Sequence, residues 1–346
     1  MLRSTPLDDF LTDAPASEAA VRLETIGLAI SLPTLMVAIG LIAYLAWVHR
    51  GERHEVTGLV RIAIVAAVAS AFGAAIEVLG ASRLFEISWA DAFADGTAAA
   101  PMMRLMAALM IALGLYDHAV QADDAGDKLG DDNDNDNDND NDAGDALSGQ
   151  IMRWVPSAAS SFALVGAALA VLSFAFDGHT VTTPPRTLVA VLDVVHVAAG
   201  AVWLGGVVGI VVVSQFFRRG GGSIAGLLLR FSGVAAISLL AVAVAGALMS
   251  WAIVDGLRDY VDTEWGQRLI AKVAVVSIAA AGGAYNHFRL VPRLAAHGQT
   301  AGTDTRDIAG ELAPAEIFAR KVLIIEALAL VGVLALTVIL VQASTV

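Results

Sequence analysis

Eight apolar stretches dominate the chain, each of roughly the 20 residues that a helix needs to cross the ~30 Å hydrocarbon core of a bilayer. They cover approximately residues 26–48, 58–80, 98–119, 152–176, 187–216, 230–254, 267–287 and 321–342. In lipid, only helices and closed barrels satisfy every backbone hydrogen bond. The sequence therefore predicts an all-α polytopic membrane helix bundle of about eight transmembrane helices in two four-helix halves.

The composition agrees with a membrane protein and excludes an ordinary soluble enzyme. Hydrophobic residues make up 57% of the 346 residues, charged residues 16%, and the mean hydropathy is +0.70. The net charge of −13 is mostly local, because residues 121–150 contribute −10 of it. The chain has no cysteine, which excludes disulfides and thiolate metal sites and leaves His, Met and carboxylates as metal ligands.

The apolar stretches divide the chain into four segments. Residues 1–25 form an outer N-terminal segment in which we identify no removable signal peptide. Residues 26–120 carry the N-terminal membrane helices, and residues 151–346 form the C-terminal membrane half. Between them, residues 121–150 include "DDNDNDNDNDND", a low-complexity linker that cannot bury a core. A calcium loop is the alternative, but the run lacks the Gly and the closing Glu of an EF-hand.

The positions of Lys and Arg predict the orientation of the bundle. When the loops are assigned alternately to the two sides, 13 of the 21 basic residues fall on the side of the acidic linker. The positive-inside rule makes that side cytoplasmic. We therefore expect a multi-pass protein of the cell (plasma) membrane with both termini outside.

The two halves are weakly similar to each other. Each half has a helix that opens with Arg, followed by a helix with a basic residue a third of the way along and His near its end. Similar composition alone is the alternative explanation. A parallel repeat of this kind predicts that the substrate path lies near the interface between the halves.

His196 stands alone in the apolar run from Leu188 to Phe217. Arg186 precedes it by ten residues, or about 15 Å of helix, which puts the imidazole near the middle of the bilayer. Asp193, Gly200 and Trp203 share its helix face. We expect Asp193 to hydrogen-bond to one ring nitrogen and leave the other for a ligand. The alternative is that His196 and Asp193 only hold helices together.

Three motifs in the second half resemble the membrane domain of the CopD family of copper resistance and copper uptake proteins. They are "LDVVHVAAGAVWLGG", "LLLRFSGVAAISLLAVAVAGALMSW" and "TEWGQRLIAKVAVVSIAAAGGAYNHFRLVPRL", and the resemblance covers about residues 186–294. "FDGHT", just upstream, is similar to a Gly-His element of that family. Some members carry a fused copper-binding β-sandwich that is missing here, which leaves open which extracytoplasmic copper-binding protein, if any, delivers the metal.

The resemblance implies copper as the bound or transported ion, with His179 at the outer mouth and His196 at mid-depth as its leading ligands. Imidazole suits copper in either oxidation state, and thioether sulfur favours Cu(I). A stripe of methionines is more often flexible core filler than a metal site. In a copper protein without cysteine, it becomes a candidate. The predicted metal residues are His179, His196, Asp193, Met249, Met102, Met106 and Met110.

Other ionisable residues receive structural interpretations. Glu77 and Arg104 are expected to pair inside the membrane, and shaping the field seen by an incoming cation is the alternative. His287 lies at the cytoplasmic end of the seventh stretch, where histidine costs little, and a metal exit site is the alternative. His49 and His54 lie in a basic cytoplasmic loop and are expected to be solvated.

The function expected from these observations is copper transport or handling, not enzymatic catalysis. No nucleotide-binding glycine motif is present, so transport has to run on an ion gradient or on the membrane potential. We expect copper and membrane lipid as partners and no nucleic acid. Two alternatives remain: a haem-bearing membrane oxidoreductase with His ligands, and a scaffold that delivers copper without transporting it.

Overall fold

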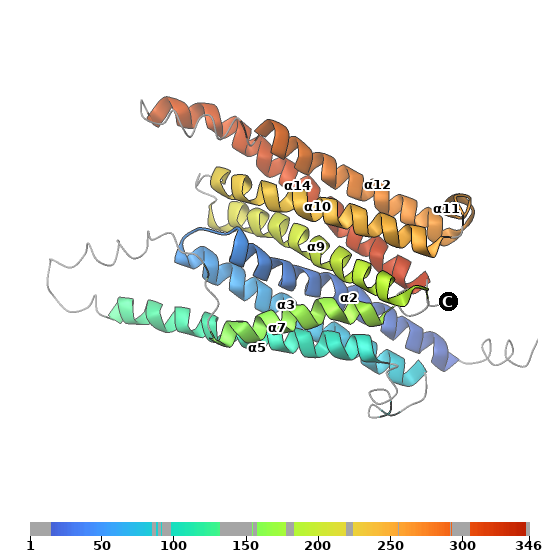
Figure 1. Ribbon diagram of the computed structural model, residues 1–346. Helices are drawn as coiled ribbons and strands as arrows, with labels where there is room; N and C mark the ends of the chain where they lie inside the picture. Colours follow the sequence, from blue (N-terminus) through green and yellow to red (C-terminus); the bar gives the residue numbers. More distant parts are fainter. Residues whose placement is uncertain are drawn as a thin grey trace, which may run out of the picture.

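The chain folds into an elongated bundle of nearly aligned helices (Figure 1). The computed structural model describes residues 15–84, 88, 91, 98–131, 154, 158–177, 183–218, 224–254, 256–290, 292 and 305–343, with only the backbone given at several helix ends. Most of these residues are helical, and none of them forms a strand. The predicted all-α fold is confirmed.

The first half contains α2 (Pro15–Trp47), α3 (Arg53–Leu84), α5 (Ala99–Asp131) and α7 (Ala158–Ser173), which continues into the short η2 (Phe174–Phe176). The second contains α9 (Arg186–Val212) with η3 (Val213–Phe217), α10 (Ala225–Ile253), α11 (Asp259–Asp262), α12 (Glu264–Tyr285) with η4 (Asn286–Leu290), and α14 (Thr305–Ala343). The Thr263 hydroxyl caps α12 by accepting the Gly266 N–H at 3.0 Å.

All eight predicted stretches form helices. Among the described residues, seven helices are long and apolar enough to cross a membrane, including the one that contains Pro101 and Arg104. The fourth stretch forms a shorter apolar helix, Ser160–Phe176. The start of α2 and the end of α14 lie at the same end of the bundle (Figure 1), as an even number of crossings requires.

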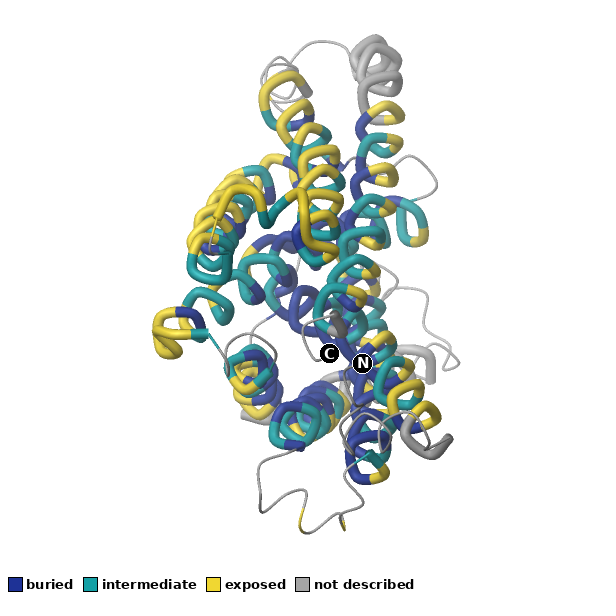
Figure 2. Tube along the Cα trace, turned by 90° about the vertical axis from the view of Figure 1, so that its right-hand side faces the viewer, coloured by how far each residue is buried: buried dark blue, intermediate teal, exposed yellow. Residues whose placement is uncertain are grey.

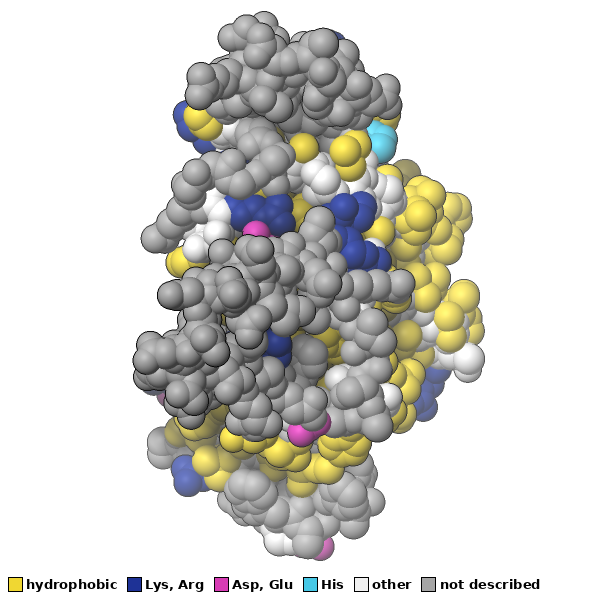
Figure 3. Space-filling view, turned by 90° about the vertical axis from the view of Figure 1, so that its left-hand side faces the viewer, with side chains coloured by type: hydrophobic (Ala, Val, Ile, Leu, Met, Phe, Trp, Pro, Cys, Tyr) yellow, Lys and Arg dark blue, Asp and Glu magenta, His cyan; other side chains and the backbone are white. Residues whose placement is uncertain are grey.

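The opposite end, where α2 passes into α3 and α9 into α10, is rich in arginine. Figure 3 shows Lys and Arg atoms on the described part of this surface. Arg218 binds both oxygens of Glu55, and Arg230 donates to the carbonyl of Val48. These arginines therefore tie the two halves together at the end that the sequence predicts to be cytoplasmic.

Helix burial is uneven across the bundle. The main core is formed by α2 and α9 with their neighbours, and it contains buried residues such as Leu35, Leu41 and Ile210. In contrast, few residues of α10, α12 and α14 are buried, and the rest are half-buried or exposed, which Figure 2 shows as intermediate and exposed positions along the outer helices. In a membrane these faces meet lipid tails or partners embedded in the bilayer.

Two glycines let α2 and α9 approach backbone to backbone. A Cβ atom at Gly40 would lie only 2.7 Å from the Cα of Gly205, and one at Gly205 would overlap the backbone of Gly40. The next residue, Gly206, is covered by the ring of Phe231 on α10. The two glycines of the "WLGG" sequence thus let α9 pack closely against two helices, as small residues commonly do at helix contacts in membranes.

We predict that Gly205→Ala lowers the stability of the protein in detergent by about 1–3 kcal/mol, the usual cost of forcing a methyl group into a closed contact. Thermal unfolding followed by intrinsic fluorescence measures the effect as a lower midpoint. Gly233→Ala is the control, because nothing lies within 4 Å of a Cβ there and alanine favours a helix. Equal midpoints for the two variants would refute the close α2–α9 contact.

Candidate functional site

His196 lies halfway along α9 with its ring against α10. Its Nδ1 atom is 3.0 Å from the carbonyl oxygen of Val242, and a Cβ atom at Gly246 would lie 3.1 Å from the ring. A carbonyl oxygen only accepts hydrogen bonds, so Nδ1 carries the proton and Nε2 of the neutral ring keeps its lone pair. The predicted tautomer lock therefore exists, but the prediction that Asp193 provides it is wrong.

Asp193 instead interacts with a lysine from another helix. It lies one turn before His196, half-buried, and Lys272 of α12 is near enough to interact electrostatically with both residues. The sequence analysis counted Lys272 only as the basic residue a third of the way along its helix. The sequence does contain a signal for this interaction, namely an acid on α9 and a base at comparable depth on α12. Charged residues inside a membrane usually interact with a residue of opposite charge.

The same face of α9 continues through Gly200 to Trp203. A Cβ atom at Gly200 would lie 3.5 Å from the terminal methyl of Met36 on α2, so a thioether that the sequence analysis did not single out approaches this face. One turn further, the indole N–H of Trp203 donates to Oε1 of Glu326 on α14 at 2.9 Å. Both side chains are buried, with 3% relative exposure each. Sequence reasoning missed Glu326, although it is the one acid within the stretch 321–342.

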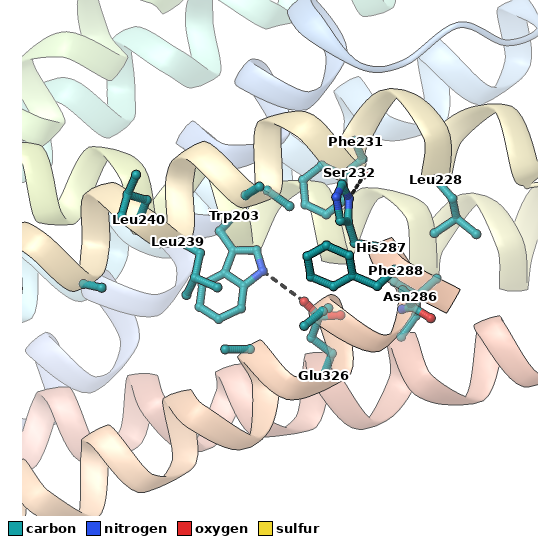
Figure 4. A pocket seen from close by; sticks show the side chains of 17 residues that line it. Trp203, Leu228, Phe231, Ser232, Leu239, Leu240, Asn286, His287, Phe288 and Glu326 are labelled. Atoms are coloured by element: carbon teal, nitrogen blue, oxygen red, sulfur yellow. Dashed lines mark hydrogen bonds between the residues drawn. The ribbon is translucent and has the colours of Figure 1, made fainter. Parts of the chain in front are cut away.

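A cavity of about 370 Å³ lies beside this pair, between α9, α10, α12 and α14. It occurs where α10 and α12 are separated, since these two consecutive long helices make few contacts. Figure 4 shows Trp203 pointing at Glu326, with His287 and Phe288 on the other side of the cavity. Ser232 and Asn286 also line the cavity, and the rest of its walls are apolar, from residues such as Leu228, Leu239 and Leu240.

The comparison with protein families matches residues 225–340 to copper resistance protein D, CopD. These residues, 116 of the 346, are similar to that family and are called the CopD segment. No curated protein and no solved structure matches the chain. The CopD segment extends from the start of α10 nearly to the end of α14, so it includes Lys272, His287 and Glu326. The resemblance to CopD that the sequence indicates is confirmed, but the matched residues differ from those expected. Helix α9, which contains His196, lies before them.

The match indicates a relation to copper resistance proteins, and seven helices in the described part of the chain are long and apolar enough to cross a membrane. Among the described residues, no group of three or more His, Asp or Glu is placed to hold a metal ion. The unprotonated Nε2 of His196 is a donor atom of a type that copper accepts, because neutral imidazole is a common copper ligand.

The predicted metal residues that the structure describes lie on three helices, α5, α9 and α10. Met249 is half-buried on α10 within the CopD segment, seven residues beyond the carbonyl that binds His196. The stripe of three methionines lies on α5, which packs mainly against α3 and α7 and not against α9. His179 lies outside the described residues. The roles in metal binding remain predictions for His179, His196, Asp193, Met249, Met102, Met106 and Met110.

The predicted pairing of Glu77 and Arg104 is confirmed, and it forms part of a larger network. One arginine nitrogen lies 2.5 Å from Glu77, and another lies 2.7 Å from Asp177 just after η2. Ser31 of α2 donates a hydrogen bond to Glu77. The network joins α2, α3 and α5, remote from the CopD segment, and its interlocking bonds support a structural role.

His49 is fully buried, so the expectation that it is solvated is wrong. Its Nε2 atom lies 3.5 Å from the Glu55 carboxylate, which Arg218 binds at 2.6 and 2.9 Å. Burial lowers the pKa of His49 to about 4, outweighing the opposite effect of Glu55. The α2–α3 connection thus folds inward under the end of α9, a contact that a basic loop sequence does not reveal.

We predict that acid destabilises the protein through His49. The pKa of His49 is 6.5 in the unfolded chain and about 4 in the folded protein. At a pH between these two values, His49 binds a proton in the unfolded chain but not in the folded protein. Stability is therefore lost as the pH falls from 6.5 toward 4, by about 3 kcal/mol at most. Unfolding midpoints measured across this range should fall less steeply for His49→Gln than for wild type.

The exposed neighbour His54 provides the control for this measurement. His54→Gln should follow the wild-type dependence on pH. If His49→Gln followed it as well, His49 would be protonated normally in the folded protein and the burial assigned to it would be refuted.

Proposed function

We propose that the chain carries copper across the membrane along the seam between α9 and α10, with His196 as the ligand at mid-depth. The observation that carries the proposal is the hydrogen bond from Nδ1 to the Val242 carbonyl at 3.0 Å. This bond fixes the ring and leaves Nε2 as a lone-pair donor in the interior of the bundle, which is the arrangement of a metal-binding histidine supported by an outer-shell partner.

The surroundings of His196 support an ion that binds nitrogen and sulfur. The thioether side chain of Met36 approaches the same face of α9 at Gly200, and Met249 lies further along α10. Asp193 interacts electrostatically with Lys272, so the seam contains an acid as well as a base. A short, weak ligand set also suits transport, because an ion that moves on has to be released.

The positions of the described histidines disfavour a haem protein. His287 is hydrogen-bonded to Ser232 of α10, and His196 to Val242 of the same helix. Ser232 and Val242 are ten residues apart, or about 15 Å along the axis. Two axial ligands of one haem iron have to face each other across a single ring, so these two histidines do not form a bis-histidine site.

Copper uptake into proteoliposomes tests the proposal. His196→Ala should reduce the initial rate at least tenfold, because the mid-membrane ligand is lost, while the yield of inserted protein stays unchanged. His54→Ala, which alters an exposed histidine at the end of the bundle, should transport like wild type. Unaltered uptake by His196→Ala would overturn the site.

Two other outcomes would favour the alternatives. Wild-type protein that binds copper but transports none would be a delivery scaffold. A strong pyridine haemochrome spectrum from the purified protein would instead identify a haem protein.

A further inference from the structure

The cavity beside Glu326 has a shape and a chemistry that copper transport does not explain. At about 370 Å³ it is within the range of sites for small organic molecules and far larger than a metal ion needs. Its walls are mostly aliphatic and aromatic side chains, with Ser232, Asn286, His287 and Glu326 as polar residues, and no group of three His, Asp or Glu placed to hold a metal ion lies among the described residues. From this cavity we propose that the protein binds a lipophilic organic cation, which enters from the bilayer and places its charge at Glu326.

The route into the cavity selects a lipophilic molecule. Residues on both sides of its opening are exposed on the flank of the bundle, among them Leu240 of α10 at 65% and Phe288 of η4 at 72% relative exposure. Ala243 and Ala284 are exposed beside them. The opening lies between membrane-spanning helices, so it faces lipid tails. A ligand that uses it has to dissolve in the hydrocarbon first.

The inner wall of the cavity selects a positive charge. Glu326 is 97% buried, and its Oε1 accepts the indole N–H of Trp203. In the part of the chain that the structure describes, no Lys or Arg is paired with this carboxylate. A buried carboxylate without a counter-ion is costly in a medium of low dielectric constant, and a bound cation removes that cost.

Aromatic rings add a second attraction for a cation. Trp203, Phe231 and Phe288 all line the cavity (Figure 4). The faces of aromatic rings attract cations, most strongly where water is excluded. Gly283 of α12 supplies the space for the carboxylate, because a Cβ atom there would lie 3.3 Å from Oε1 of Glu326. The aromatic rings, the Glu326 carboxylate and the lateral opening of the cavity together favour a delocalised or quaternary cation over a hydrated metal ion.

Binding of tetraphenylphosphonium tests the inference in uncharged maltoside micelles at pH 8. We expect this cation to quench the tryptophan fluorescence of the wild-type protein saturably, because Trp203 lines the site. Glu326→Gln should weaken its affinity at least tenfold. Triphenylphosphine oxide, a neutral compound of similar shape, should bind the wild type and Glu326→Gln equally.

Two further variants separate the charge from the space. Glu264→Gln changes an exposed carboxylate at the far end of α12 and should bind tetraphenylphosphonium like wild type. Ala284→Phe fills the opening and should weaken both compounds. Equal affinity of wild type and Glu326→Gln for the cation, or no saturable binding to the wild type, would overturn the proposal.

The experiment is independent of copper transport. His196→Ala leaves the cavity intact and should bind tetraphenylphosphonium normally, whether or not it still transports copper. Either proposal can therefore be refuted without affecting the other.

Discussion

The close contact between α2 and α9 determines how the rest of the bundle is arranged. Gly40 and Gly205 let the two backbones meet, so α9 becomes the central helix of the structure, flanked by α2 on one side and by α10 and α14 on others. Because lipid tails are as apolar as leucine, such packing has to replace the hydrophobic driving force that water supplies elsewhere. Once α9 is fixed, its polar face is directed toward α10, α12 and α14.

The polar groups inside the bundle fall into two classes. Arg104 with Glu77 and Asp177, and Arg218 with Glu55, are ion pairs that leave little capacity for a ligand, and they join helices. His196 and Glu326 are different, because each has one atom fixed by a hydrogen bond and keeps further capacity to bind. A buried polar group without a hydrogen-bond partner raises the free energy of the folded protein. Buried groups that can still accept a further bond are therefore characteristic of a binding site.

The sequence predicted what depends on local composition and missed what depends on contacts between distant segments. The lengths of the apolar runs were sufficient to predict the helices, and their charges predicted the Glu77–Arg104 pair. The partner of His196 is a backbone carbonyl 46 residues later, which carries no sequence signal. The burial of His49 depends on Arg218 and Glu55, and the cavity depends on the separation of α10 from α12. The CopD-like motifs indicated copper, but only the fold shows which imidazole nitrogen is available.

X-ray absorption spectroscopy at the copper edge tests most directly whether Nε2 of His196 binds copper. Purified protein loaded with copper should show the scattering pattern of a coordinated imidazole, and His196→Ala should lose it. His287→Ala should retain it, because that ring lies at Ser232, about 15 Å along α10 from the carbonyl that binds His196. The account predicts a change in the first coordination shell for His196→Ala alone. Identical spectra for wild type and His196→Ala would contradict it.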